Sequence, residues 1–130
     1  MPSRDPMHLH PELRILHARW LETCGVRGID VLTTCTYRSQ AEQDILYAQG
    51  RTTPGKRVTW TRTSRHSETV NGYPASTAWD FVVLVAGKAV WNAKHPHWAM
   101  AGKVAEELGL DWGGAWAKNK DYPHIQMVRR

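Results

Sequence analysis

The sequence predicts one α+β domain, in which about three helices pack against a small, mainly antiparallel sheet. Its 130 residues fall within the size range of an ordinary domain, and an apolar content of 42% is enough for a single core. Helical and strand periodicities succeed one another without an internal repeat, a linker or a low-complexity tract. We therefore expect a single domain over residues 1–130, with residues 1–9 loosely ordered.

The first half of the chain predicts two helices separated by one strand. Residues 11–24 place four apolar side chains on one helical face, with a proline in the first turn and a glycine after the end. Residues 29–36 alternate in a β-branched run and are expected to form a strand. Ser39 and Glu42 have the spacing of a capping box, which predicts a helix over residues 40–49.

The second half predicts a long loop followed by strands and a third helix. Residues 51–76 are rich in Thr, Ser, Arg, Gly and Pro without a stable period, which is typical of a loop region. Residues 77–85 form a strongly apolar strand, and a short turn leads back to a second strand. A helix is expected over residues 97–108 with Gly109 as its stop, and the chain closes with a strand over residues 124–128.

Charge and composition restrict the partners. A net charge of +5 favours an anionic partner, but no nucleic-acid-binding signature accompanies the dispersed cations, so nucleic acid is not expected. The two cysteines, Cys24 and Cys35, have no CxxC spacing and are expected to be reduced thiols. Neither a signal-peptide-like stretch nor a spanning apolar run occurs, which predicts a cytoplasmic protein without stable membrane insertion.

An acidic residue interrupts the most apolar predicted strand, where Asp80 lies between Trp79 and Phe81. An unpaired carboxylate in a buried strand is costly, so a cationic group must meet it. A neighbouring arginine is one interpretation. His66, in the preceding loop, and His124, at the start of the last strand, provide another, because two neutral imidazoles and a carboxylate form the protein ligand set of a catalytic zinc. Spacing alone leaves both interpretations open.

Other histidines and the tryptophans favour structural roles. His95 and His97 flank a proline at a helix start, where capping is expected rather than metal binding. His8, His10 and His17 could imitate a metal cluster, but the first two lie near the N-terminus, where the chain is expected to fray. Each of the seven tryptophans is expected in the core, although such rings also line sites for sugars and peptides.

Five segments together resemble the zinc peptidases grouped as LAS enzymes, which include D-alanyl-D-alanine carboxypeptidases and the L-alanyl-D-glutamate endopeptidases of phage endolysins. The segments, in order, are Tyr37-Arg38-Ser39, Ser64-x-His66, Ala78-x-Asp80, Gly109-Leu110-x-Trp112-Gly113-Gly114-x-Trp116 and Asp121-x-Pro123-His124. The resemblance implies a fold like that of hedgehog domains and D-alanyl-D-alanine peptidases. The last two segments look like the endolysin branch.

The resemblance also implies a role for each matching residue. It implies a catalytic zinc held by His66, Asp80 and His124, and a general base at Asp121. Further roles are substrate contacts at Arg38, Ser64, Trp112 and Trp116, with the Arg38 cation also placed at the oxyanion. From its position alone, Asp121 could instead be a turn residue, and Arg38 could pair with Glu42 one helical turn on.

One interval departs from the family pattern. Thirteen residues separate His66 from Asp80, whereas the family usually has about six. The extra residues must loop out if both ligands are to reach one metal, and Asn71-Gly72 is a suitable turn. We expect this loop at the rim of the site, where it would affect substrate preference.

These observations predict a monomeric zinc endopeptidase that acts on peptidoglycan stem peptides, with the L-alanyl-D-glutamate bond as the expected target. Synthesis in the host cytoplasm before release to the cell wall, as for a phage endolysin, is part of this expectation. Two alternatives remain. One is a D-alanyl-D-alanine carboxypeptidase with the same zinc site. The other is a non-catalytic zinc-stabilised module, because hedgehog domains resemble this fold.

Overall fold

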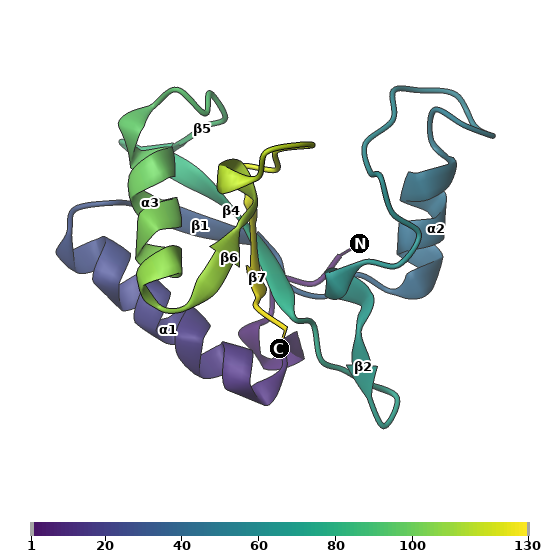
Figure 1. Ribbon diagram of the computed structural model, residues 1–130, viewed down its shortest axis with the longest axis horizontal. Helices are drawn as coiled ribbons and strands as arrows, with labels where there is room; N and C mark the ends of the chain where they lie inside the picture. Colours follow the sequence, from purple (N-terminus) through teal and green to yellow (C-terminus); the bar gives the residue numbers. More distant parts are fainter. Residues whose placement is uncertain (1, 130) are drawn as a thin grey trace.

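The computed structural model describes residues 2–129 and confirms the predicted α+β class (Figure 1). The helices are α1 (Pro11–Val26), α2 (Gln40–Ala48) and α3 (Pro96–Glu107). The strands of the main sheet are β1 (Val31–Cys35), β4 (Ala78–Val85), β5 (Lys88–Val90), β6 (Leu110–Trp112) and β7 (His124–Met127). Short elements complete the chain: η1 (Pro6–His8), η2 (Arg65–Ser67), β2 (Thr69–Val70), β3 (Tyr73–Pro74) and η3 (Gly113–Ala115).

The longest strand, β4, organises the sheet. It pairs antiparallel with β1 along one edge and with β7 and β5 along the other, and β6 continues the sheet beyond β7. Every pairing in this sheet is antiparallel, as the sequence predicts. Asp80 of β4 therefore has a paired strand on each side: β1 on one and β7 on the other.

Alternation along β4 separates the face that packs against α1 and α3 from the face that carries Asp80. Trp79, Phe81 and Val83 are fully buried and point to the side covered by α1 and α3. There the rings of Trp79 and Phe81 pack about Trp20 of α1, with ring centres 5.3 and 5.0 Å from it. Since successive strand residues point to opposite faces, Asp80 points away from this core.

The second helix stands on the opposite side of the molecule from α1 and α3 (Figure 1). Ser39 and Glu42 form the predicted capping box at its start. Its buried Gln43 donates a hydrogen bond of 2.7 Å to the carbonyl oxygen of Thr61. This bond ties the helix to the loop that returns to the sheet.

The N-terminal segment differs from the expectation of loose order. Leu9 is fully buried, and Ser3 exchanges backbone hydrogen bonds with Tyr37 and Thr36 at the end of β1. This pairing and the burial of one apolar side chain fix the segment; Met1 lies outside the described residues. The predicted loop over residues 51–76 also contains a small hairpin and a 3-10 turn. Within residues 2–129, no helix combines the length and apolarity needed to cross a membrane.

A histidine occupies the core side of α1, where sequence analysis left its role open. His17 is 2% exposed, its Nε2 lies 2.8 Å from the Thr33 hydroxyl, and its ring packs edge-on against Trp79. Burial lowers the pKa of His17 from 6.5 to about 4. The neutral ring is therefore part of the folded core.

This burial predicts a loss of stability in mild acid. Between pH 6.5 and 4 the unfolded chain binds a proton that folded His17 does not, so the free energy of unfolding falls as the pH falls. From pH 7 to 4.5 the contribution is about 2–3 kcal/mol. In urea unfolding, His17→Gln should lose that much less than the unsubstituted protein over this range. Parallel pH profiles for the two proteins would contradict the assignment.

Candidate functional site

Three predicted ligands meet on the polar face of the sheet. Asp80 of β4 is directly opposite His124 of β7 in the antiparallel register, and its Oδ1 lies 3.3 Å from His124 Nδ1. His66 arrives from η2, whose first turn is capped by the Ser64 side chain, and its Nε2 lies 3.1 Å from the same Asp80 oxygen. Residues 66, 80 and 124 thus converge although they are far apart in the sequence.

Each histidine has a separate acceptor on its outer nitrogen. His66 Nδ1 lies 3.1 Å from the Thr36 carbonyl oxygen, and His124 Nε2 lies 2.8 Å from Oε1 of Gln126. When an outer nitrogen donates its hydrogen to such an acceptor, the inner nitrogen is free to offer a lone pair to a metal. Both rings are therefore oriented as metal-ligating histidines are.

The electrostatics of the centre are dominated by the Asp80 carboxylate. Burial alone would raise the pKa of Asp80, but the adjacent His66 and His124 outweigh it and hold this pKa well below its usual range. Burial likewise opposes charge on His66, yet Asp80 raises the pKa of that imidazole above its ordinary value. The site is built to accept positive charge next to Asp80, whether carried by protons or by a cation.

A cysteine also lies at this centre. Donor atoms of Cys35, His66 and Asp80 all lie within 4.8 Å of one another, and His124 contacts Asp80 from outside that cluster. Cys35 Sγ is 3.7 Å from Nδ1 of His66, the nitrogen that faces the Thr36 carbonyl rather than Asp80. The two imidazoles and the carboxylate remain the set that fits zinc, with the thiol behind His66.

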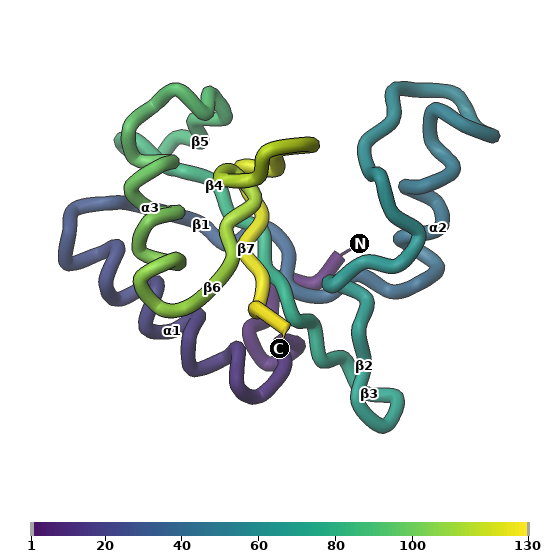
Figure 2. The backbone as a smooth tube through the Cα atoms, viewed as in Figure 1, coloured from purple at the N-terminus to yellow at the C-terminus, as the bar shows by residue number. Residues whose placement is uncertain are grey.

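The centre opens into a pocket of about 680 Å³. One wall comes from residues 58–66 and the other from residues 116–121. In Figure 2 the loop over residues 116–121 points toward the segment that follows α2. Arg38 lies at the base, where one guanidinium nitrogen donates to Gln43 Oε1 at 2.9 Å and another is 3.9 Å from Oδ2 of Asp80. A molecule in this pocket would meet both the His66–Asp80–His124 centre and the Arg38 cation.

Asp121 lies at the edge of the same pocket. Its side chain is 49% exposed, and Oδ2 is 4.0 Å from Nδ1 of His124. Loss of solvent raises the pKa of Asp121, with His124 acting in the opposite direction. Gly113 accepts the Asp121 backbone N–H at 3.0 Å, and a Cβ at Gly113 would overlap the Asp121 carbonyl oxygen. The glycine at residue 113 therefore lets Asp121 approach His124.

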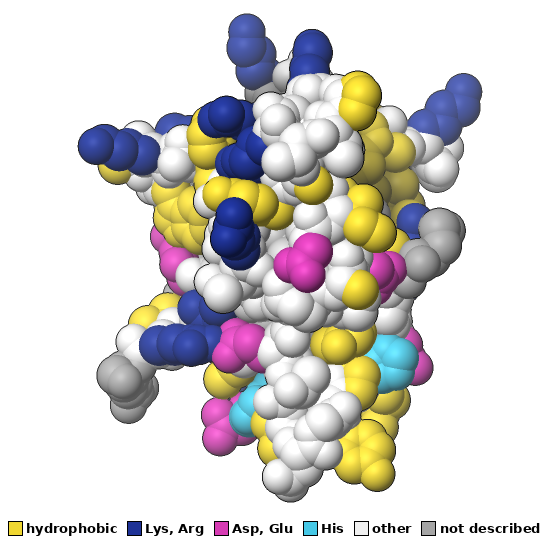
Figure 3. All heavy atoms as spheres, turned by 90° about the vertical axis from the view of Figure 1, so that its right-hand side faces the viewer, with side chains coloured by type: hydrophobic (Ala, Val, Ile, Leu, Met, Phe, Trp, Pro, Cys, Tyr) yellow, Lys and Arg dark blue, Asp and Glu magenta, His cyan; other side chains and the backbone are white. Residues whose placement is uncertain are grey.

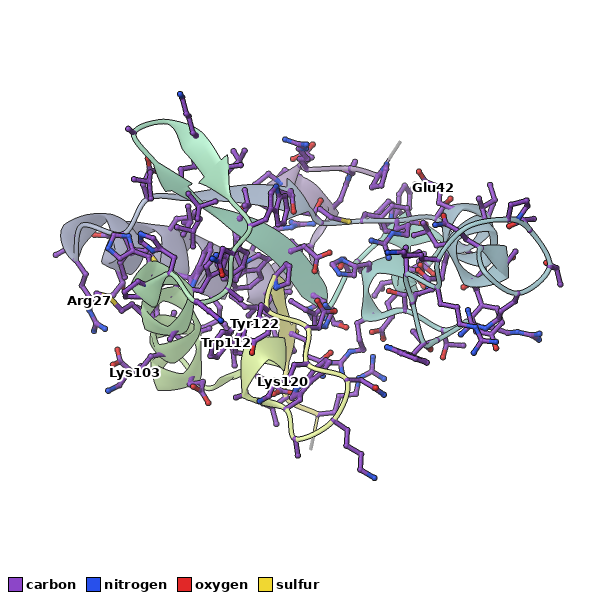
Figure 4. All side chains as sticks on the ribbon, turned by 90° about the horizontal axis from the view of Figure 1, so that it is seen from above. Arg27, Glu42, Lys103, Trp112, Lys120 and Tyr122 are labelled. Atoms are coloured by element: carbon purple, nitrogen blue, oxygen red, sulfur yellow. The ribbon has the colours of Figure 1, made fainter. Side chains whose placement is uncertain are left out.

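The predicted substrate contacts divide between the pocket and the core. Ser64 and Trp116 line the pocket, and the Trp116 ring is 5.5 Å from that of His124. Trp112 does not line it: it is 8% exposed, and its indole N–H donates to the Tyr122 carbonyl at 2.8 Å. Figure 4 shows Trp112 and Tyr122 side by side at the foot of the loop that carries Lys120.

Trp112 is thus a scaffold residue, which agrees with the core position expected of the tryptophans; the substrate contact that the resemblance implied stays a prediction. Cβ atoms added at Gly102 or Gly114 would both overlap its indole ring. The double glycine after Trp112 therefore serves close packing, at Gly114 against the indole and at Gly113 against Asp121.

The extra residues between two of the ligands form the hairpin β2–β3. Its turn is the expected one, because Asn71 and Gly72 have φ of 52° and 80°. The expected position at the rim of the site is wrong: no residue between 67 and 79 lines the pocket, and the hairpin projects from the body away from α2 (Figure 1). Glu68, at the base of the hairpin, forms ion pairs with Arg65 and Arg129, and these pairs hold the hairpin in that orientation.

Sequence analysis missed the residues that hold the site in place: Thr36 and Gln126 face the two histidines, and Gln43 accepts a hydrogen bond from Arg38. A backbone carbonyl such as that of Thr36 leaves no sequence signal. Gln126 had one, because it follows His124 by two residues in a predicted strand and must share its face.

Comparison with known proteins supports the same assignment. A family model described as D-alanyl-D-alanine carboxypeptidase, of peptidase family M15, matches residues 59–127. The peptidoglycan L-alanyl-D-glutamate endopeptidase CwlK of Bacillus subtilis (strain 168) is 34% identical over 95% of this chain and 75% of its own length. In structure, the L-Ala D-Glu endopeptidase ChiX of Serratia marcescens aligns with a TM-score of 0.71 at 24% identity, over 98% of this chain and 89% of that one.

The family match includes Ser64, His66, Asp80, Asp121 and His124, and the similarity to CwlK extends over nearly the whole chain. The chain therefore belongs to the M15 peptidases and is a metallopeptidase.

Proposed function

We propose that this protein is a zinc-dependent endopeptidase that hydrolyses the L-alanyl-D-glutamate bond of peptidoglycan stem peptides. The observation that carries the proposal is its 34% identity, over 95% of the chain, to a peptidoglycan L-alanyl-D-glutamate endopeptidase. The convergence of two histidines and a carboxylate beside a pocket supports it. The family description as carboxypeptidase favours a second candidate, removal of a terminal D-alanine by the same site.

In this proposal His66, Asp80 and His124 hold the zinc ion. Bound zinc lowers the pKa of a water molecule and polarises a carbonyl oxygen. Asp121, at the pocket edge, accepts the proton from the attacking water and delivers it to the amine that leaves. Arg38, fixed by Gln43 beside Asp80, contributes positive charge where the oxyanion develops.

The charge of the surface supports a polyanionic substrate. Lys118 and Lys120 belong to one wall of the pocket. On the face that α2 and the following loop present, Lys and Arg side chains gather in the upper part of Figure 3, and Lys56, Arg57 and Arg62 of that loop are exposed. Carboxylates of stem peptides and other anionic wall polymers would be attracted to this face. Action as a phage-type endolysin, released to the wall from the cytoplasm, is included in the proposal.

Metal content tests the ligand assignment. The purified protein should carry about one zinc ion per chain by elemental analysis, because its two oriented imidazoles and one carboxylate complete a catalytic ligand set. His66→Ala and His124→Ala should lose most of it, and their thermal unfolding should no longer respond to added zinc. His97→Ala is the matched control, since His97 lies outside the site. Full zinc in either ligand variant would reject the assignment.

Mass spectrometry of digested peptidoglycan tests the bond. The proposed activity should yield muropeptides that end at L-alanine, together with free peptides that begin with D-glutamate. Release of single D-alanine residues would instead establish the carboxypeptidase. If purified walls of several compositions remain undigested by zinc-loaded protein, the enzymatic proposal fails.

Substitution of the general base separates catalysis from metal binding. Asp121→Asn keeps the shape of the side chain but removes the proton acceptor, so wall digestion should slow by on the order of 10²–10⁴. Zinc content should be unchanged, because the substitution leaves the three ligands in place. Asp30→Asn, at an exposed position, controls for the change in charge. Near-normal digestion by zinc-replete Asp121→Asn would remove Asp121 from the mechanism.

A further inference from the structure

A chain of hydrogen bonds leads away from the metal site along the polar face of the sheet. Oε1 of Gln126 lies 2.8 Å from His124 Nε2, and Nε2 of Gln126 lies 3.1 Å from Asp111 Oδ2. The other carboxylate oxygen of Asp111 accepts the indole N–H of Trp116 at 3.0 Å. Four side chains are thus connected in series: Trp116, Asp111, Gln126 and His124.

The sheet register places these side chains in one row. His124 and Gln126 are two apart on β7 and share a face, and Asp111 of β6 is directly opposite Gln126. On the other side of β7, Asp80 is directly opposite His124. Ile125, which lies between His124 and Gln126 on β7, points to the opposite face and is fully buried in the core. The chain is therefore fixed by backbone pairing.

The donor and acceptor groups of these four side chains allow the hydrogen bonds to run in only one direction, with each donor on a fixed side. The Trp116 indole can only donate, and an ionised Asp111 can only accept. Gln126 must then present its amide N–H₂ to Asp111, which turns its carbonyl oxygen toward His124. That oxygen accepts a hydrogen only from a protonated Nε2 of His124. Nδ1 of His124 is the nitrogen left to face Asp80, 3.3 Å away.

We propose that Asp111 and Gln126 are positioning residues that select the metal-binding tautomer of His124. The inference rests on zinc binding at this site, as proposed above. Among the described residues 2–129, neither of the two has a hydrogen bond to Asp80 or His66, so both act through the His124 ring. A carboxylate linked to a ligating histidine is a common second partner in zinc sites, and here a glutamine is interposed between them. Trp116 holds the far end and also packs against the His124 ring.

Substitution at Asp111 tests the direction of the chain at a distance from the metal. Asn in place of Asp111 has nearly the same shape but can donate as well as accept, so Gln126 is free to flip and present N–H to His124. Zinc affinity, measured by competition with a chromophoric chelator, should fall about 10–100-fold in Asp111→Asn. Gln126→Leu should show a similar loss, and Asp30→Asn should show none.

A compensating substitution makes the test specific. In the double variant Asp111→Asn with Gln126→Glu, the new carboxylate can accept from both the Asn amide and Nε2 of His124, so the direction is restored. Zinc affinity of this double variant should return to within a few-fold of the unsubstituted protein. A role of Asp111 in folding alone would instead lower the unfolding temperature of the metal-free protein and would not be reversed in zinc affinity by Gln126→Glu.

The outcomes separate this inference from the proposed function. If the unsubstituted protein binds zinc and digests peptidoglycan while Asp111→Asn binds zinc equally well, the positioning role is wrong and the proposed function stands. Failure of the double variant to regain affinity would also overturn the directional argument. If the unsubstituted protein binds no zinc, both the metal site and this inference fall.

Discussion

A half-buried carboxylate on the central strand, that of Asp80, is the constraint around which this protein is arranged. Asp80 lies on β4 between neighbours on both sides, where an uncompensated negative charge would cost several kcal/mol. Three separate segments supply compensation: η2 brings His66, β7 brings His124, and the end of β1 leads to Arg38. A divalent cation would compensate the same negative charge. Asp80 therefore needs a positive partner for the stability of the fold, and the same carboxylate is a ligand in the proposed catalytic site.

The two faces of the sheet divide the work between packing and chemistry. On one face, tryptophan and phenylalanine rings pack between the sheet and two helices, which holds the strands in a fixed register. On the other face, that register aligns the ligands and their hydrogen-bond partners. The Trp-Gly-Gly segment connects the faces, since Trp112 is buried on the core side while the backbone beyond it carries Asp121 close to the metal site. Because residues 113 and 114 are glycines, the backbone can pack closely against Asp121 at residue 113 and against the Trp112 indole at residue 114.

Local signals in the sequence predicted the local structure well. The capping box at Ser39 and the turn at Asn71-Gly72 depend on short-range chemistry, and the structure has both. Alternation around Asp80 likewise identified a strand with an anomalous charge. The convergence of the ligands rested on family resemblance, because no local signal brings His66 to His124. Features set by tertiary packing were missed: the docking of Leu9, the direction of the hairpin and the partners of the histidines.

Because of the hairpin between them, the number of residues from His66 to Asp80 does not determine the distance between their side chains. An antiparallel pair returns the chain beside its own starting point, so its length can change while its two ends stay the same distance apart. Metal ligands that flank such a hairpin tolerate insertions that would ruin a motif defined by a fixed interval. Pattern searches that require one interval will overlook such chains. For engineering, the tip at Asn71-Gly72 is an attachment point for a wall-binding peptide or a reporter, since it projects away from the pocket.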